Sequence, residues 1–341
     1  MAKFEQWREN KRTPLGEVAP LDTPYNILIE TSSLCNAKCI YCAHSQKDDP
    51  VFKGNMSMDI FYKILQDVKE FPHKIKLFEM FGYGEPLCNP RLAEMISIAR
   101  KADVVDKIAF TTNGLLFNKE NSEALIKSGV DIIRISLQGL DADTYYKTCG
   151  VKINMQDFIS NLKYLYQIRG NCSIRIKIAD VALKEDDGKE KLMNMFGSMA
   201  DSVFIEHILP MFSDVAYQDI DEKINTNTLN GREDVKQSSV NVVCHRPFYR
   251  LRVAANGLVT AACCDTPHDF CYGDIMHQSL KELWNGKKHE ALLKMQLEGN
   301  RFSNPICKNC VLPNDITNQN DLIDKSALKI LERLQQKTYG F

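Results

Sequence analysis

Short apolar runs alternate with longer amphipathic segments between residues 25 and 210. Helical spacing of apolar residues predicts helices near 58–70, 90–102, 119–128, 155–169 and 187–200. Alternating strands and helices predict an α/β fold with a parallel sheet, here a partial (β/α)6 TIM-like barrel. In such a barrel, functional side chains follow the carboxyl ends of the strands. The predicted strands are 25–31, 75–81, 107–112, 131–137, 173–183 and 202–209.

The pattern changes after residue 210. Residues 211–240 are polar, and alternating residues around Asn256-Gly257 then predict a β-hairpin. A helix near 278–297, interrupted at Gly286, precedes a cysteine pair, and an amphipathic helix is predicted over 321–337. We therefore expect an N-terminal extension, a barrel, a linker, a small second domain and a C-terminal helix. Their predicted bounds are 1–24, 25–215, 216–240, 241–315 and 316–341.

Composition indicates which binding partners and which cellular location to expect. The 43 basic and 44 acidic residues give a net charge of −1 with no basic stripe, so we expect no nucleic-acid partner. The polar N-terminus has no signal-peptide core, and no long apolar run predicts a membrane span. A cytoplasmic location is therefore expected. Twelve cysteines in such a protein favour metal or redox chemistry over disulfides.

Three cysteines follow the first predicted strand in a C-x3-C-x2-C spacing: Cys35, Cys39 and Cys42. Three thiolates on one loop can bind three irons of a [4Fe–4S] cubane and leave the fourth iron open to another ligand. The alternative is a closed zinc site, which needs four ligands, and His44 is the candidate for the fourth.

This spacing resembles the radical S-adenosylmethionine (SAM) superfamily, in which SAM chelates the open iron. Tyr41 matches an aromatic residue that the family places just before the third cysteine, near the adenine of SAM. The segment Gly82, Tyr83, Gly84 and Glu85 resembles the family's GGE motif, which holds the SAM amine, with Tyr83 as a departure from a second glycine.

Further polar residues end the later strands. By the same resemblance, Ser136 and Gln138 match positions that contact the SAM ribose and the substrate, and Asn113, after Thr112, points into the barrel mouth. Arg175 and Lys177 share a strand face, where they are candidates for pairing with the SAM carboxylate and for catalysis. The alternative for all of these is a solvated strand end or a helix cap.

A second cysteine group surrounds the predicted hairpin and resembles the twitch domain, a shortened SPASM domain that binds an auxiliary [4Fe–4S] cluster through four thiolates. Either Cys263 or Cys264 supplies the second ligand, and the strand pattern leaves both open. A zinc ribbon is the alternative. The candidate ligands are Cys244, Cys263, Cys264, Cys307 and Cys310.

The combination resembles 2-deoxy-scyllo-inosamine dehydrogenase. The resemblance implies two [4Fe–4S] clusters, SAM, a reductant such as flavodoxin or ferredoxin, and oxidation of a sugar or aminocyclitol alcohol to a ketone. Sugar epimerisation and maturation of a ribosomal peptide or protein are the alternatives. The residues before the first predicted strand, 1–24, are too few for the winged-helix-like domain that often binds leader peptides. A noncatalytic zinc-stabilised module is the interpretation from another class.

Overall fold

The structure is a computed structural model that describes residues 2–5, 12–46, 52–183, 187–210, 215–221, 241–262, 270–314 and 319–339. A ten-stranded sheet runs through these residues in the order β1-β7-β6-β5-β4-β3-β2-β8-β9-β10. Its strands are β1 (Lys3–Phe4), β2 (Asn26–Ile29), β3 (Ile75–Glu79), β4 (Val105–Thr112), β5 (Ile132–Leu137), β6 (Ser173–Ala179), β7 (Ser202–Glu206), β8 (Arg250–Val253), β9 (Leu258–Thr260) and β10 (Cys271–Asp274).

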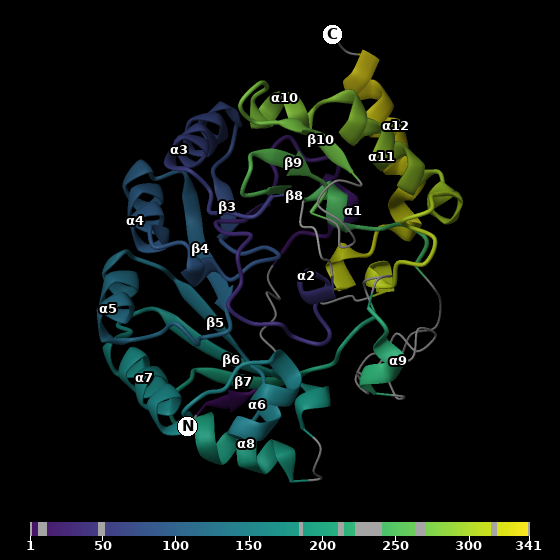
Figure 1. Ribbon diagram of the computed structural model, residues 1–341. Coiled ribbons are helices and arrows are strands. Elements are labelled where there is room, and N and C mark those ends of the chain that lie inside the picture. The colour runs from purple at the N-terminus through teal and green to yellow at the C-terminus, as the bar shows by residue number, and fades with distance from the viewer. Residues whose placement is uncertain are drawn as a thin grey trace.

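Eight of the twelve α-helices in the described residues fall into two groups. An outer arc of α3, α4, α5, α7 and α8 surrounds the strands, and α10, α11 and α12 lie beside the β8–β10 end (Figure 1). The α-helices are α1 (Leu15–Val18), α2 (Ala43–Gln46), α3 (Met58–Asp67), α4 (Leu92–Ala102), α5 (Lys119–Lys127), α6 (Ala142–Cys149), α7 (Met155–Ile168), α8 (Gly188–Phe196), α9 (Tyr217–Ile220), α10 (Leu280–Trp284), α11 (Lys287–Leu297) and α12 (Ala327–Tyr339).

Strands β2 to β7 are parallel, and each pairs with the strand before and after it in sequence. Strand β7 does not close onto β2. It pairs with β1 instead, while the other side of β2 pairs with β8. The predicted partial α/β barrel is therefore confirmed as an open sheet.

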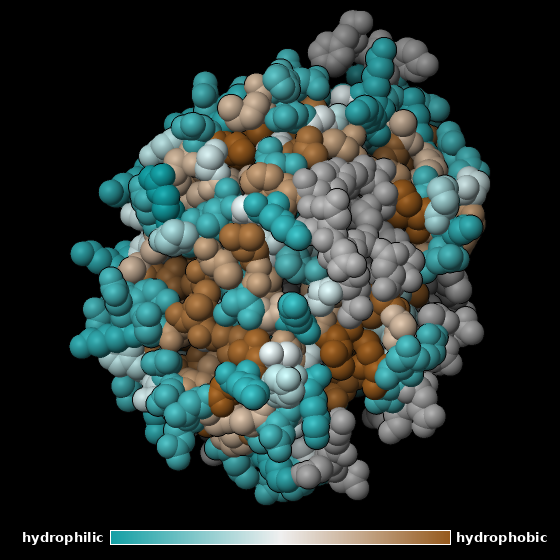
Figure 2. Space-filling model, in the orientation of Figure 1, coloured by the Kyte–Doolittle hydropathy of each residue, from teal (hydrophilic) through white to brown (hydrophobic). Residues whose placement is uncertain are grey.

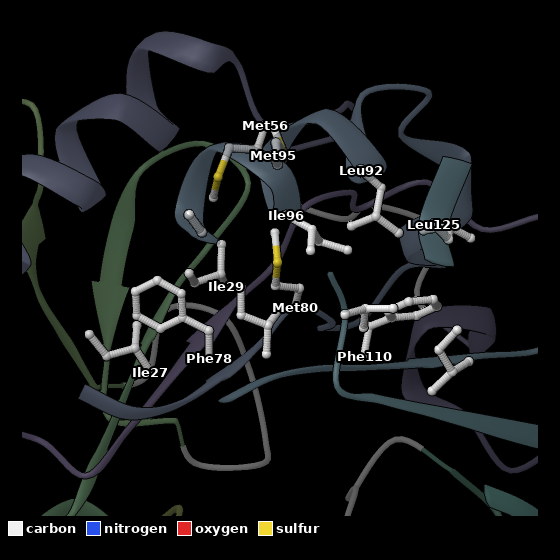
Figure 3. Packing of buried hydrophobic residues seen from close by; sticks show 14 of the residues in the cluster. Ile27, Ile29, Met56, Phe78, Met80, Leu92, Met95, Ile96, Phe110 and Leu125 are labelled. Carbon is white, nitrogen blue, oxygen red and sulfur yellow. The ribbon is translucent and has the colours of Figure 1, made fainter. Parts of the chain in front are cut away.

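The main core lies between the sheet and the outer helices. Figure 3 shows Phe78 of β3, Met80 directly after that strand and Phe110 of β4 packed near Met95 and Ile96 of α4. All five side chains are fully buried. Burial of each contributes roughly 1.5–3 kcal/mol, so this layer fixes the strands whose ends carry the site. Hydrophilic side chains dominate the outline of the molecule, and hydrophobic ones gather nearer the middle of the same face (Figure 2).

Both edges of the barrel sheet hold segments that sequence analysis placed outside it. Lys3 and Phe4, in the predicted N-terminal extension, pair in parallel with Ser202 and Val203 of β7. The predicted hairpin is present, with Gly257 at φ 90° in its turn. Its first strand, β8, pairs in parallel with β2 over four residues. The second domain thus continues the sheet of the barrel.

Some elements differ from the prediction. Helix α6 was not predicted, and the predicted strand 173–183 ends at Ala179, where a 3-10 turn begins. The predicted break at Gly286 is confirmed, because this residue caps the start of α11. Most of the predicted linker (222–240) and both Cys263 and Cys264 lie outside the described residues. None of the helices described is long and apolar enough to cross a membrane.

Candidate active site and metal centres

The first cysteine loop connects β2 to α2 and is held by α6. The amide of Lys38 donates to the carbonyl of Cys149 at 2.8 Å, and the amide of Ile40 donates to the carbonyl of Thr148 at 3.0 Å. Within the loop, the Cys42 amide donates to the Cys39 carbonyl at 3.1 Å. The helix missed by sequence analysis therefore fixes the backbone on both sides of Cys39.

The three thiols of this loop are shielded from water. Burial raises the pKa of Cys35 to about 12, and burial also raises the pKa values of Cys39 and Cys42. Thiols in such a place become thiolates only against a metal centre, which deprotonates its ligands. These donors fit an iron–sulfur cluster.

His44 was the candidate for a fourth zinc ligand beside the three cysteines. In the described ranges, no three His, Cys, Asp or Glu side chains converge closely enough to hold one metal ion. A cubane requires wider spacing, since each thiolate binds a different iron. The Nε2 atom of His44 lies 2.7 Å from the Ser33 carbonyl, so this ring nitrogen already has a hydrogen-bond partner.

The glycine loop after β3 packs directly against the cysteine loop. A Cβ on Gly84 would lie 2.4 Å from the Ser32 carbonyl oxygen and 2.5 Å from that of Leu34, so no larger residue fits. The Glu85 amide donates to the same Leu34 carbonyl at 2.7 Å. The two loops predicted to bind the cluster and SAM therefore form one unit.

Glu85 ties this unit to the end of β4. Its buried carboxylate accepts hydrogen bonds from the Thr112 hydroxyl at 2.6 Å, the Asn113 amide at 2.7 Å and the Leu87 amide at 3.0 Å. Burial raises the pKa of Glu85 despite these donors. The Asn113 side chain in turn donates to Asn36 Oδ1 at 2.7 Å, inside the cysteine loop. Glu85 thus positions the backbone of the glycine loop.

Tyr41, Ser136 and Gln138 meet at the end of β5. The Tyr41 hydroxyl donates to Gln138 Oε1, and the Gln138 amide nitrogen donates to the Ser136 carbonyl at 3.1 Å. Burial raises the pKa of Tyr41 well above its ordinary value, so the hydroxyl stays a donor. Ser136 lies opposite Lys177 of β6 in the parallel register.

The two basic residues of β6 lie at different depths. Arg175 is two residues further from the carboxyl end of β6 than Lys177, and its Nε donates to Ser173 Oγ at 3.2 Å. Lys177 forms an ion pair with Glu206 of β7. Just beyond the strands, His207 Nδ1 lies 2.8 Å from Asp180 Oδ2.

Sequence analysis missed two buried carboxylates inside the sheet. Glu79 accepts hydrogen bonds from Asn26 Nδ2 at 2.6 Å, Arg134 at 2.9 Å and Arg250 at 2.6 Å. Burial alone would raise its pKa, but the two guanidinium groups outweigh this effect and lower it. The sequence feature that could have indicated both residues is a glutamate at the end of an apolar run, Glu30 in NILIE and Glu79 in IKLFE.

Glu30, the second missed carboxylate, joins the glycine loop to the hairpin. It accepts hydrogen bonds from the Tyr83 amide at 2.8 Å, from Arg252 at 2.9 Å and from the Ala255 amide at 3.3 Å. The Arg252 guanidinium also lies over the Tyr83 ring, 4.3 Å from its centroid. A Cβ on Gly82 would lie 2.6 Å from Glu30 Cγ, which explains the glycine there.

Cys244, Cys307 and Cys310 line one small cavity together with Gln296 and Arg301. Gln296 accepts from the Cys244 amide at 3.0 Å and donates toward Cys307 Sγ at 3.6 Å. Burial raises the pKa of Cys244 to about 11, so this thiol too needs a metal to ionise. The three described cysteines fit a second cluster.

The fourth ligand of this second site stays a prediction, because Cys263 and Cys264 lie outside the described residues. Ala262 has φ 48°, so the chain leaves strand geometry directly before them. Strand β9 ends at Thr260, so the alternation of strand faces is described no further than that residue.

Residues 29–182 match the Radical SAM superfamily, and residues 244–311 match the SPASM iron–sulfur cluster-binding domain. The chain therefore contains a radical SAM domain followed by an SPASM domain. A radical SAM domain implies SAM and a [4Fe–4S] cluster, and an SPASM domain implies additional iron–sulfur clusters. The cofactors predicted from sequence are thereby confirmed, and the noncatalytic zinc module is not supported.

One curated protein matches about half of the chain. The chain is 26% identical over 190 residues to a tungsten-containing aldehyde ferredoxin oxidoreductase cofactor-modifying protein of Pyrococcus furiosus, covering 54% of this chain and 52% of that protein. The match thus spans about half the length of this curated relative.

Two solved structures share the fold over most of the chain. BtrN, 2-deoxy-scyllo-inosamine dehydrogenase, in complex with AdoMet and 2-DOIA, has a TM-score of 0.53 at 19% identity and covers 84% of this chain and 92% of its own. SuiB of Streptococcus suis, bound to its precursor peptide SuiA, has a TM-score of 0.59 at 17% identity, with coverage of 88% and 72%. At these identities the likeness shows the fold.

Proposed function

We propose that this radical SAM enzyme is a dehydrogenase that oxidises a hydroxyl group of a sugar, an aminocyclitol or a similar polar metabolite to a ketone. The observation that carries the proposal is the Asp180–His207 pair beyond the ends of β6 and β7, on the side of the sheet where Tyr41 and Gln138 meet. Removing hydrogen from an alcohol requires a base for the hydroxyl proton, and this pair supplies one.

Asp180 fixes both the orientation and the tautomer of His207. One carboxylate oxygen, Oδ2, accepts from His207 Nδ1, while Oδ1 accepts from the amides of Val181 at 2.9 Å and Ile208 at 3.2 Å. With Nδ1 as the donor, Nε2 is the basic nitrogen of the ring. A carboxylate in this position stabilises the imidazolium that forms when Nε2 takes a proton. Both side chains are about one-third exposed, so a substrate can reach them.

Oxidation of the alcohol to a ketone removes a hydrogen atom, an electron and a proton from the carbinol group. When bound, SAM and its cluster supply the radical that removes the C–H hydrogen atom, and the auxiliary cluster supplies a one-electron acceptor. His207 Nε2 takes the hydroxyl proton, leaving the carbonyl. The Lys177–Glu206 ion pair supplies further polar groups on the same two strands, which suits a hydroxyl-rich substrate. A reductant such as flavodoxin or ferredoxin completes the proposed set of partners.

The test uses the anaerobically reconstituted full chain with a panel of sugars, aminocyclitols and short peptides, analysed by mass spectrometry. We expect a ketone product lighter by two hydrogen atoms, with one 5′-deoxyadenosine formed for each product. His207→Gln should lower ketone formation about 10²–10⁴-fold while hydrogen-atom transfer into 5′-deoxyadenosine continues. Asp180→Asn should act in the same direction, because it removes the charge that stabilises the imidazolium.

His277→Gln is the matched control, since His277 is exposed in the second domain and should leave turnover unchanged. A product of unchanged mass would show epimerisation instead and would reject the dehydrogenase. Equal ketone formation by the His207 and His277 variants would remove His207 from the role of base.

Peptide maturation is the second candidate. It is supported by the fold shared with SuiB, whose structure holds a precursor peptide. Modification of a peptide in the panel, with no sugar or aminocyclitol consumed, would favour this candidate over the first.

A further inference from the structure

Arg301 is a buried cation in the second domain. It lies in the 3-10 turn Asn300–Ser303 after α11 and is 2% exposed. Its Nη2 donates to the Cys310 carbonyl at 2.8 Å. Its Nε and Nη1 atoms are buried and have no hydrogen-bond partner among the residues that the structure describes. A guanidinium group is always charged, so this charge needs compensation.

No carboxylate within the described ranges forms an ion pair with Arg301. The guanidinium carbon also lies 4.7 Å from the centroid of the Phe302 ring. An isolated buried charge is strongly unfavourable, and buried charges in proteins are paired or face a metal centre. The environment of Arg301 therefore calls for an anion.

The cavity that Arg301 lines is also lined by Cys244, Cys307 and Cys310. A [4Fe–4S] cluster with four thiolate ligands carries a net negative charge, which increases by one on reduction. Cluster sulfurs accept hydrogen bonds, and such bonds together with nearby charge set the reduction potential. The cluster is thus the anion that the unpartnered side of Arg301 fits.

We propose that Arg301 is a positioning residue for the auxiliary cluster: Nη2 holds the Cys310 backbone, and Nε and Nη1 donate to cluster or cysteinyl sulfur. This arrangement balances the cluster charge and stabilises the reduced state more than the oxidised state. The proposal goes beyond the assigned cofactor, because it names the residue that tunes it, and it does not depend on the identity of the substrate.

The chain offers a matched control for charge. Lys308 lies between the ligands Cys307 and Cys310 but is exposed. Lys308→Gln and Arg301→Gln each remove one positive charge close to the same ligands in sequence. Solvent screens the exposed charge far more than the buried one. Arg301→Lys keeps the charge and loses the planar set of donors.

The experiment is a redox titration followed by electron paramagnetic resonance. All variants are made in the full chain with Cys35, Cys39 and Cys42 replaced by alanine, so that the signal comes from the auxiliary cluster alone. For Arg301→Gln we expect a reduction equilibrium about tenfold less favourable, which corresponds to ~59 mV more negative for one electron. Arg301→Lys should lie between this variant and the parent, and Lys308→Gln should match the parent.

Equal shifts in the Arg301→Gln and Lys308→Gln variants, or no shift in either, would overturn the proposal. If Arg301→Gln does not bind iron, Arg301→Lys becomes the deciding variant. A cluster retained in Arg301→Lys would show that the positive charge is what holds it, and the proposal would stand. Loss of iron from both Arg301 variants would show that the side chain acts through packing, and this too would overturn it.

Discussion

The ion pair between Glu30 and Arg252 predicts a large effect from a small change in chemistry. Glu30→Gln keeps the shape of the side chain and removes its charge. The Arg252 guanidinium, whose side chain is 4% exposed, would then remain buried without the carboxylate that now lies 2.9 Å away. The Tyr83 and Ala255 amides would also lose a charged acceptor.

The expected loss follows from this burial. Removing one partner of a buried ion pair costs about 3–5 kcal/mol, because the other charge is left uncompensated. Replacing both partners removes that penalty, so Glu30→Gln combined with Arg252→Met should lose less than the sum of the single variants. The difference should be about 1–3 kcal/mol, as expected for residues in direct contact.

Urea unfolding of the full chain, followed by circular dichroism, measures these free energies. Glu94→Gln is the control, since Glu94 pairs with Arg91 at 2.8 Å but both side chains are about half exposed. This variant should unfold like the parent, because exposed pairs contribute little. The reasoning is refuted if the Glu30 and Glu94 variants are equally stable, or if the double variant simply adds the two single losses.

Four further substitutions test other parts of the structure. Arginines hold the pKa of Glu79 below its ordinary 4.5, so its stabilising contribution is complete above that pH and is lost as the pH falls through the folded-state pKa. Urea unfolding at a series of pH values should therefore show that the free energy of unfolding of Glu79→Gln falls less steeply in acid than that of the parent. An equally steep fall in both proteins would contradict this. Gly84→Ala should abolish 5′-deoxyadenosine formation, since its Cβ would lie 2.4 Å from a backbone oxygen, and wild-type rates would show that the loop tolerates the side chain. Cys35→Ala should lose both SAM cleavage and one cluster's iron, whereas Cys307→Ala should lose the same amount of iron and still cleave SAM.

The parts of the site that follow from local sequence were predictable. Three cysteines within one loop and a glycine pair after the next strand need no knowledge of distant residues, and the structure packs these two loops together. Helix α6 escaped prediction because ADTYYKTC offers two buried apolar side chains, Tyr145 and Cys149, across two turns. Its helical start comes instead from Asp141, whose side chain accepts from the Thr144 amide.

The ionic contacts inside the sheet were not predictable in the same way. Glu30 and Arg252 are 222 residues apart in sequence, and Glu79 and Arg250 are 171 apart. Such pairs depend on which strands become neighbours and in which register. The shared face of Arg175 and Lys177 follows from strand alternation. The pairing of Lys177 with Glu206 requires the order of β6 and β7.

The parallel pairing of β8 with β2 makes the second domain inseparable from the first. The cysteine loop begins where β2 ends, and β8 follows the segment that carries Cys244, so backbone hydrogen bonds between the two strands set how far apart the iron sites lie. Cutting the chain before β8 would also leave β2 as a bare, apolar edge open to other chains, a known route to aggregation. An exchange of auxiliary domains between related proteins would therefore have to transfer β2 and β8 together.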